Sequence, residues 1–256
     1  MEELSVESFA TWNTWAQYIA MAFGALGVLT LISHSIRLAT INDSKKKYDF
    51  INRNEINTLL TTGVMFIIGG AFYFNSNIVE LTVLMVFVRL FVTVMMALIM
   101  GVIIQNLLKF YYPFYIEKRL RALRFRPRIS PKTGKPMKLL SEDEEDVFLD
   151  EGMQAEEEIY SVDYDVWVDE ETGYTKIEKY AGHLHALQCP ECNYQTFKVN
   201  REEIVRQPTV MIEGELIKHF ECQYCGYKAR KSYHIATLNN PVNPTATTTS
   251  GTPATA

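Results

Sequence analysis

Signatures of enzyme chemistry are missing from this chain of 256 residues. It contains no Gly-Lys-Ser/Thr phosphate-binding loop, no Gly-x-Ser-x-Gly nucleophile elbow and no His-Glu-x-x-His metalloprotease pattern. Each absence removes one common class of catalyst, and no other catalytic constellation replaces them. The sequence therefore predicts that the protein is not an enzyme.

Charge is nearly absent from residues 58–108, where only Glu80 and Arg89 are charged. Three apolar stretches, residues 16–36, 59–74 and 81–108, fill most of the first half of the chain. A bilayer core of about 30 Å requires roughly 20 helical residues, so each stretch is adequate for one crossing. Buried helices of a soluble protein are the alternative, but three such stretches in series disfavour it. We expect an α-helical membrane domain of three transmembrane helices over 16–108.

Basic residues are lacking on one side of these stretches. Residues 1–15 and the turn 75–80 hold no Lys or Arg, whereas 37–53 and 109–128 hold many. The positive-inside rule then predicts an extracytoplasmic N-terminus over 1–15 and a cytoplasmic C-terminal region. The acidic start lacks a basic segment and an Ala-x-Ala site, so no cleaved signal peptide is expected. The predicted location is a bacterial inner (plasma) membrane.

Arg89 is the one ionisable residue that these expectations place within the third stretch. As an intramembrane functional residue it would belong to an ion or substrate path, because charge in lipid is unfavourable. Alternatively, the span begins at Leu90 and Arg89 extends to the outer headgroups. The second interpretation is favoured, since no acidic partner is evident at the same depth.

Residues 109–128 interleave aromatic and basic side chains directly after the third stretch. Such a segment is typical of a helix lying on the cytoplasmic headgroup surface. Stacking on single-stranded nucleic acid is the alternative. The position next to a predicted span favours the membrane surface.

Residues 139–175 have no Lys or Arg but hold 15 of the 30 acidic residues. Ser141 precedes a run of acids, as expected at a helix start. Paired carboxylates also occur in acid–base catalysis and cation sites, but a solvated face that docks on the basic segment is favoured. The net charge of −5 argues against general affinity for nucleic acid.

Cysteine is scarce, and its four copies form two Cys-x-x-Cys pairs with none left over: Cys189, Cys192, Cys222 and Cys225. In a reducing cytosol this spacing indicates metal ligands and not disulfides. Alternating residues over 194–199, 216–221 and 227–235 predict short antiparallel strands, so we expect a small β-rich zinc ribbon over 181–237. Four protein thiolates leave no open position, which predicts one structural zinc ion, with iron as the alternative. His183, His185 and His219 lie nearby and are interpreted as supporting or surface residues.

An earlier segment repeats the pattern without sulfur. Ser130 and Thr133 precede a glycine as in Cys-x-x-Cys-Gly, and so do Asp169 and Thr172, at 59 and 53 residues before the matching cysteines. Hydroxyls are poor zinc ligands. We interpret 129–180 as an acidic region that contains a degenerate, metal-free ribbon whose former metal positions are these four residues.

The run Ser161-Val-Asp-Tyr-Asp-Val-Trp167, together with both cysteine pairs, resembles the cytoplasmic zinc-ribbon tail of bacterial membrane proteins that carry a TPM-type domain. The resemblance covers about 130–237 and implies cysteines at 130, 133, 169 and 172, which this chain lacks. The segments predicted outside the membrane are too short for a TPM domain. No activity of that domain is therefore carried over.

Three functions fit these features. The leading hypothesis is a membrane-anchored scaffold whose ribbon unit binds a protein partner. Besides the lipid bilayer, such a partner or a homo-oligomer is the predicted association. A small oligomeric transporter or channel subunit with a regulatory ribbon is the alternative, supported by Arg89. A membrane-tethered nucleic-acid-binding ribbon is the third and least favoured; its basic face would comprise Lys218, His219, Lys228, Arg230 and Lys231. Residues 238–256 are expected to form a disordered tail.

Overall fold

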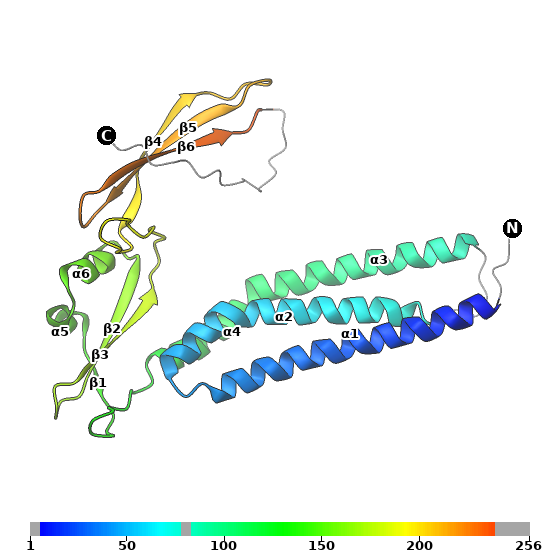
Figure 1. Ribbon diagram of the computed structural model, residues 1–256, viewed down its shortest axis with the longest axis horizontal. Coiled ribbons are helices and arrows are strands. Elements are labelled where there is room, and N and C mark those ends of the chain that lie inside the picture. Colours follow the sequence, from blue (N-terminus) through cyan, green and yellow to red (C-terminus); the bar gives the residue numbers. More distant parts are fainter. Residues whose placement is uncertain (1–5, 78–82, 239–256) are drawn as a thin grey trace. The chain divides into compact units, whose positions relative to one another are not determined.

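The computed structural model describes residues 6–77 and 83–238 and divides into two compact units, residues 1–126 and 127–256 (Figure 1). The predicted tail, apart from its first residue, and the start of the N-terminal segment lie outside the described residues. The first unit contains α1 (Val6–Thr40), α2 (Ser44–Phe74), α3 (Val83–Asn106), a π-helical turn (Leu107–Tyr111) and α4 (Tyr112–Arg124). The second contains β1 (Lys138–Leu139), α5 (Glu142–Glu145), a short 3₁₀ turn (Asp146–Phe148), α6 (Glu151–Glu158), β2 (Val162–Val168), β3 (Thr175–Ala181), β4 (Phe197–Arg206), β5 (Gly214–Cys222) and β6 (Lys228–Ile235).

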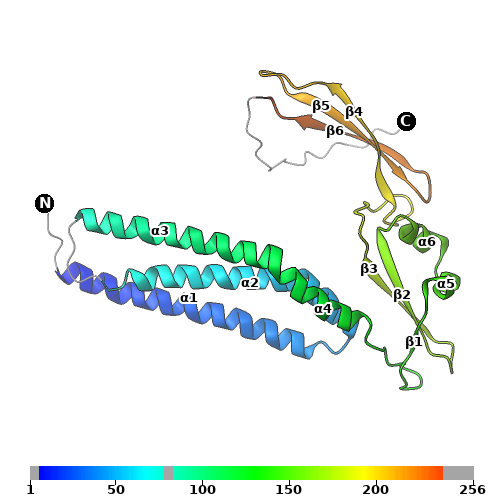
Figure 2. The same ribbon diagram turned by 180° about the vertical axis from the view of Figure 1, so that it is seen from behind.

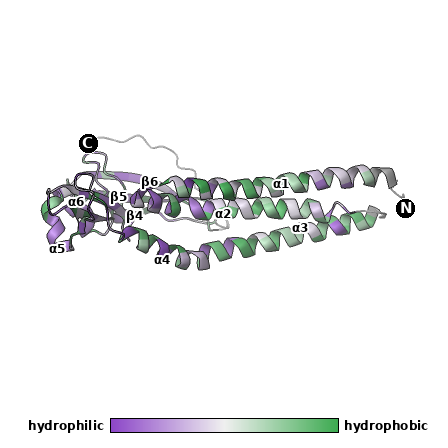
Figure 3. Ribbon diagram, turned by 90° about the horizontal axis from the view of Figure 1, so that it is seen from below, coloured by the Kyte–Doolittle hydropathy of each residue, from purple (hydrophilic) through white to green (hydrophobic). Residues whose placement is uncertain are grey.

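The long helices α1, α2 and α3 are each long and apolar enough to cross a membrane. Apolar residues dominate the middle of all three (Figure 3). Many of these side chains face outward: Phe87 and Phe91 of α3 are 65% and 61% exposed. A soluble bundle would bury such residues, so the exposure favours lipid contact over the alternative of buried soluble helices.

Small residues allow close approach where α2 meets its neighbours. A side chain on Gly69 would lie 3.2 Å from the Ala20 carbonyl of α1, and one on Gly63 would lie 3.1 Å from Ile104 of α3. Thr30 and Thr62 also share a hydrogen bond of 2.8 Å between α1 and α2. These contacts are those expected of packed helices in a membrane.

The basic helix α4 continues from α3 and packs on the start of α2. Asp43 caps α2 by accepting hydrogen bonds from two backbone amides, so that α2 begins 15 residues before the apolar stretch 59–74. Ile116 and Leu120 of α4 are buried with Ile51 of this extension. One side of α4 is therefore covered by α2, a contact that periodicity did not reveal, while the aromatic side chains at its start stay exposed. That α4 lies at the cytoplasmic headgroup surface stays a prediction.

The second unit repeats one topology twice. Strands β1, β2 and β3 form an antiparallel sheet in that order, and β4, β5 and β6 form another. Helices α5 and α6 separate the first two strands of the first sheet, where the second sheet has only the loop between β4 and β5. Helix α6 packs beside β2, as the view from behind shows (Figure 2). The strands expected over 194–199, 216–221 and 227–235 correspond to β4, β5 and β6, although β4 is longer and begins later.

Each sheet has its own small core. Val162, Tyr164 and Val166 alternate along β2 and pack with Leu149 beneath the helices. In the second sheet, the core consists of Phe197 and Phe220 together with two of the cysteines. The cysteine cluster is therefore part of the second core.

Candidate metal centre

Four cysteine side chains converge beside the second sheet. Their Sγ atoms all lie within 4.8 Å of one another, with 3.6 Å between Cys189 and Cys225 and 3.7 Å between Cys192 and Cys222. A tetrahedral ion with metal–sulfur bonds of about 2.3 Å holds its sulfurs about 3.8 Å apart. The four residues predicted from spacing thus come together in a geometry that could hold one metal ion. The donor set suits both zinc and iron.

Hydrogen bonds around Cys222 stabilise its thiolate. Its Sγ lies 3.0 Å from the Thr196 hydroxyl and accepts the Cys225 amide at 3.4 Å. Burial raises the pKa of this thiol, but these hydrogen bonds outweigh burial and lower the pKa to about 6. Burial raises the pKa of Cys192 to about 12. Metal binding would therefore displace a proton at this cluster, which makes affinity dependent on pH.

Aromatic side chains cover one side of the cluster, while Cys225 on the other side is exposed. Cys189 and Cys222 are 0% and 1% exposed, and the rings of Phe197 and Phe220 stack beside them with centroids 5.2 Å apart. Tyr227 adds a third ring at 5.8 Å from Phe197. A centre with four protein ligands and this covering resembles structural and not catalytic sites.

The four hydroxyl and carboxylate positions of the first sheet also come together. Asp169 Oδ2 accepts hydrogen bonds from Ser130 at 2.6 Å, from Thr172 at 2.8 Å and from Thr133 at 2.9 Å. These bonds lower the pKa of the Asp169 carboxyl, with the Ser130 hydroxyl as the largest cause. One carboxylate oxygen thus links both turns, as a metal ion would link four thiolates.

All four turns share one backbone pattern. In each turn, the backbone N–H of the first residue donates to the carbonyl oxygen five residues later. The carbonyl oxygen of the first residue accepts the N–H of the residue four positions later, and all of these distances are 2.8–3.1 Å. The residue at that fourth position always has a positive φ, between 63° and 74°, which Gly and Asn tolerate. These positions are Gly134, Gly173, Asn193 and Gly226. The two halves therefore match in topology and in turn geometry, with and without sulfur.

Glu156 joins the two halves and was missed by sequence reasoning. Its carboxylate is 0% exposed and accepts hydrogen bonds from the Tyr164 hydroxyl, from Lys179 at 3.0 Å and from the Gln195 amide. Gln195 belongs to the segment that leads from the first cysteine pair into β4. A second buried pair, Arg128 and Glu178 at 2.6 Å, holds the start of the unit to β3. Neither carboxylate is distinguished by its local sequence from the exposed acids of this unit.

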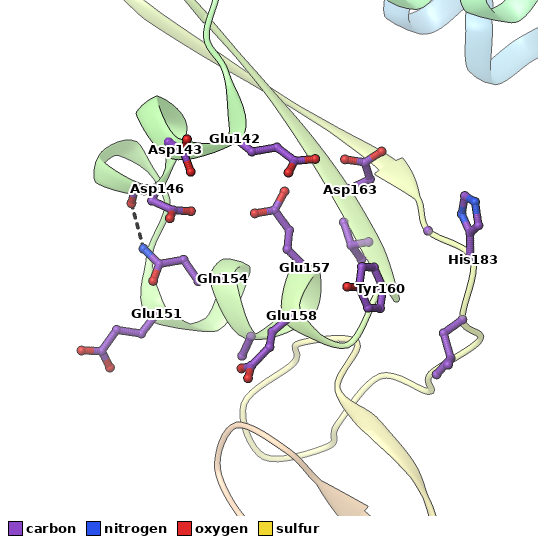
Figure 4. A pocket seen from close by; sticks show the side chains of 14 residues that line it. Glu142, Asp143, Asp146, Glu151, Gln154, Glu157, Glu158, Tyr160, Asp163 and His183 are labelled. Carbon is purple, nitrogen blue, oxygen red and sulfur yellow. Dashed lines mark hydrogen bonds between the residues drawn. The ribbon is translucent and has the colours of Figure 1, made fainter.

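Acidic side chains line a hollow of about 960 Å³ formed by α5, α6 and the ends of β2 and β3 (Figure 4). Exposed Tyr160 and His183 complete its wall. Burial, followed by the charge of neighbouring acids, raises the pKa of Glu157 at this hollow. The seven carboxylates are Glu142, Asp143, Asp146, Glu151, Glu157, Glu158 and Asp163. Their arrangement favours a cationic ligand over an anionic one.

The basic residues of the second sheet do not form one face. Neighbouring residues of a strand point to opposite sides, so Lys218 and its register partner Lys231 lie on one face, and His219 with Arg230 on the other. Lys218 and Lys228 also form ion pairs, with Glu202 at 2.7 Å and Glu221 at 3.0 Å. The single basic face expected for nucleic-acid binding is therefore divided between two sides and partly neutralised.

Comparison with protein-family models, with curated proteins and with solved structures finds no match to this chain. Its class is therefore defined by its own geometry. It combines three helices that are long and apolar enough to cross a membrane with a small antiparallel-sheet region whose four-cysteine cluster could hold a metal ion.

Proposed function

We propose that this protein is a membrane-anchored zinc-ribbon protein that acts as an interaction or scaffold subunit on the cytoplasmic face of a bacterial inner membrane. The observation that carries the proposal is the closed four-cysteine cluster in a unit that follows three lipid-length helices. A metal enclosed by four thiolates stabilises a fold but offers no position for substrate. Such a domain acts through its surface.

The distribution of basic residues supports the orientation. Arg37, Lys45 and Lys46 lie where α1 leads into α2, and α4 adds Lys118 and Arg119 at the same end of the helical unit. The segments at the opposite end carry no Lys or Arg. By the positive-inside rule, the α1–α2 connection and the second unit are cytoplasmic. A reducing cytosol keeps the four thiols available for zinc.

The acidic hollow supports a basic partner segment as the ligand of the second unit. Six of its seven carboxylates lie on the short helices and one, Asp163, lies on β2, and Tyr160 at its wall is 72% exposed. Lys or Arg side chains of a partner would neutralise this group of charges, and the exposed aromatic ring would add contact area. Electrostatic complementarity of this kind contributes to specificity and association rate.

The test is recovery of a partner from cross-linked native membranes with tagged full-length protein. We expect a stoichiometric protein partner that is lost when Cys222 and Cys225 are changed to Ser, while membrane insertion is kept. Unchanged recovery with this variant contradicts the proposal, and a homo-oligomer without a second protein would instead favour the transport alternative.

A matched pair of variants tests the hollow. Glu142→Gln with Glu158→Gln removes two carboxylates from its lining, and Glu170→Gln with Glu191→Gln removes two exposed carboxylates elsewhere in the same unit. The net charge changes equally in both. Partner recovery should fall only with the first pair, and more strongly at low salt. Equal loss with both pairs would mean that net charge, and not the hollow, attracts the partner.

A further inference from the structure

A cavity of about 550 Å³ opens between α2 and α3 near the beginning of α1. Its wall is mostly hydrocarbon, with a few polar groups gathered toward the end where α2 stops. The lining includes Trp12 of α1, Phe72 and Asn75 of α2, and Arg89, Leu90 and Ala97 of α3. A single positive charge thus adjoins an apolar chamber.

Arg89 lacks a counter-ion among residues 6–77 and 83–238. One of its terminal nitrogens donates to the Phe74 carbonyl, and the guanidinium lies 4.8 Å from the centre of the Phe74 ring. Its Nε is buried and has no hydrogen-bond acceptor. A guanidinium has five N–H donors. Among the described residues, no acidic side chain compensates the charge of Arg89, so its charge and its other terminal nitrogen can interact with a ligand.

The neighbouring polar groups, in contrast, satisfy one another. Trp12 donates to the Asn75 carbonyl at 2.8 Å, and the Asn75 amide donates to Thr93 at 3.0 Å. The Thr93 hydroxyl donates to the Arg89 carbonyl at 2.8 Å. Of the described groups at this end of the cavity, the guanidinium is the one left uncompensated, and an uncompensated cation at the edge of a bilayer is unfavourable.

The length of the cavity matches one leaflet. The α3 residues along it run from Val86 to Ala97, which is about 17 Å of helix at 1.5 Å per residue. Half of a 30 Å hydrocarbon core is about 15 Å. A chamber that begins near a helix end and extends this far suits an acyl chain entering from one membrane surface.

We propose that this cavity binds one phospholipid, with the phosphate held by Arg89 and an acyl chain lying between α2 and α3 as far as Ala97. The planar guanidinium matches phosphate oxygens with two parallel hydrogen bonds, and the apolar wall accepts the chain. The inference rests on insertion of the three helices into a bilayer, but not on the partner proposed for the second unit. It assigns Arg89 a lipid headgroup in place of an ion path.

The test is native mass spectrometry of the full-length protein in detergent, with dioleoylphosphatidylglycerol as the probe. We expect one retained lipid in the wild type and at least tenfold weaker retention with Arg89→Gln. Arg37→Gln, which removes an exposed arginine at the other end of α1, should have no effect. Ala97→Phe keeps the arginine but fills the chamber, so it should also release the lipid. Retention that is equal in the wild type and in both cavity variants would overturn the proposal.

Two further arms separate the alternatives. Inorganic phosphate should not displace the lipid, because the acyl chain contributes to binding; displacement at millimolar concentration would indicate a free-anion site and overturn the proposal. Glu80 lies outside the described residues, and lipid binding that occurs only with Glu80→Gln would mean that the chain neutralises Arg89 itself. Carbonate extraction of membranes tests insertion separately, so that release of the wild type would contradict membrane anchoring whatever the lipid result.

Discussion

The buried carboxyl of Glu145 should make the stability of the first sheet depend on pH. Its side chain is 5% exposed and accepts the Val166 amide at 3.3 Å. Burial raises its pKa from 4.5 to about 7, and the charges of Glu157, Asp165 and Asp163 add to this rise. The folded state therefore keeps a proton that the unfolded chain releases. The contribution of protonated Glu145 to the free energy of unfolding is fully present below pH 4.5 and is lost as pH rises through 7.

The magnitude follows from the size of that rise. One pKa unit corresponds to about 1.4 kcal/mol, so ionised Glu145 lowers the free energy of unfolding by about 3 kcal/mol above pH 7. Glu145→Gln retains an acceptor for the Val166 amide and cannot ionise. At about pH 8 the variant should be more stable than the wild type by about 1–3 kcal/mol, and near pH 4 the two should be equal. Glu151→Gln removes an exposed carboxylate at the start of α6 and is the matched control.

Fluorescence of Trp167 provides the assay. This residue of β2 is 2% exposed, and the chain has three tryptophans, so changing Trp12 and Trp15 to Phe leaves Trp167 alone. Urea titrations of the full-length protein in detergent, at several pH values between about 4 and 8, give the free energy of unfolding of the first sheet. Loss of metal in acid affects the second sheet, which this probe does not report. The reasoning is refuted if Glu145→Gln and the wild type are equally stable at the upper pH.

Three other outcomes are expected. Metal analysis should find one ion per chain. Cys225→Ser or a strong chelator should remove this ion and unfold the second sheet, while Trp167 in the first sheet stays buried. Simultaneous unfolding of both sheets would contradict the view that each sheet has an independent core. Arg128→Met removes the buried partner of Glu178 and leaves Lys176, at 2.9 Å, as its cation. The free energy of unfolding, measured by the same titration, should fall by about 3 kcal/mol, whereas a change below about 1 kcal/mol would show that Lys176 compensates for the loss. The four turns share one backbone hydrogen-bond pattern, so cysteines at the hydroxyl and carboxylate positions should create a second metal site. Metal analysis should then find two ions per chain. A content of one ion would mean that these two turns cannot approach each other as the cysteine turns do. The changed positions are Ser130, Thr133, Asp169 and Thr172.

Local sequence patterns were sufficient to predict the long helices, the cysteine cluster and the turns of this protein. The apolar stretches predicted the three long helices because a helix long enough to cross lipid needs an uninterrupted run of apolar residues. The Cys-x-x-Cys spacing predicted the cluster because a tight turn places both sulfurs of a pair on one side. The hydroxyl versions of these turns were also visible in the sequence, since the glycine that each turn requires was kept.

Pairing between distant residues was decided only by the tertiary structure. Arg119 donates to Glu55, 64 positions earlier in the chain, at 2.9 Å, and this contact helps to hold α4 on α2. The sequence likewise placed Ser130 and Asp169 in separate turns, and only sheet formation brings that hydroxyl within 2.6 Å of the carboxylate. Glu145 and Glu156 belong to an acidic region for which the sequence predicts a solvated face, yet the packing of the short helices on β2 buries both side chains. Burial and long-range contacts depend on how elements pack together, and the spacing of residues along one element carries no information about that.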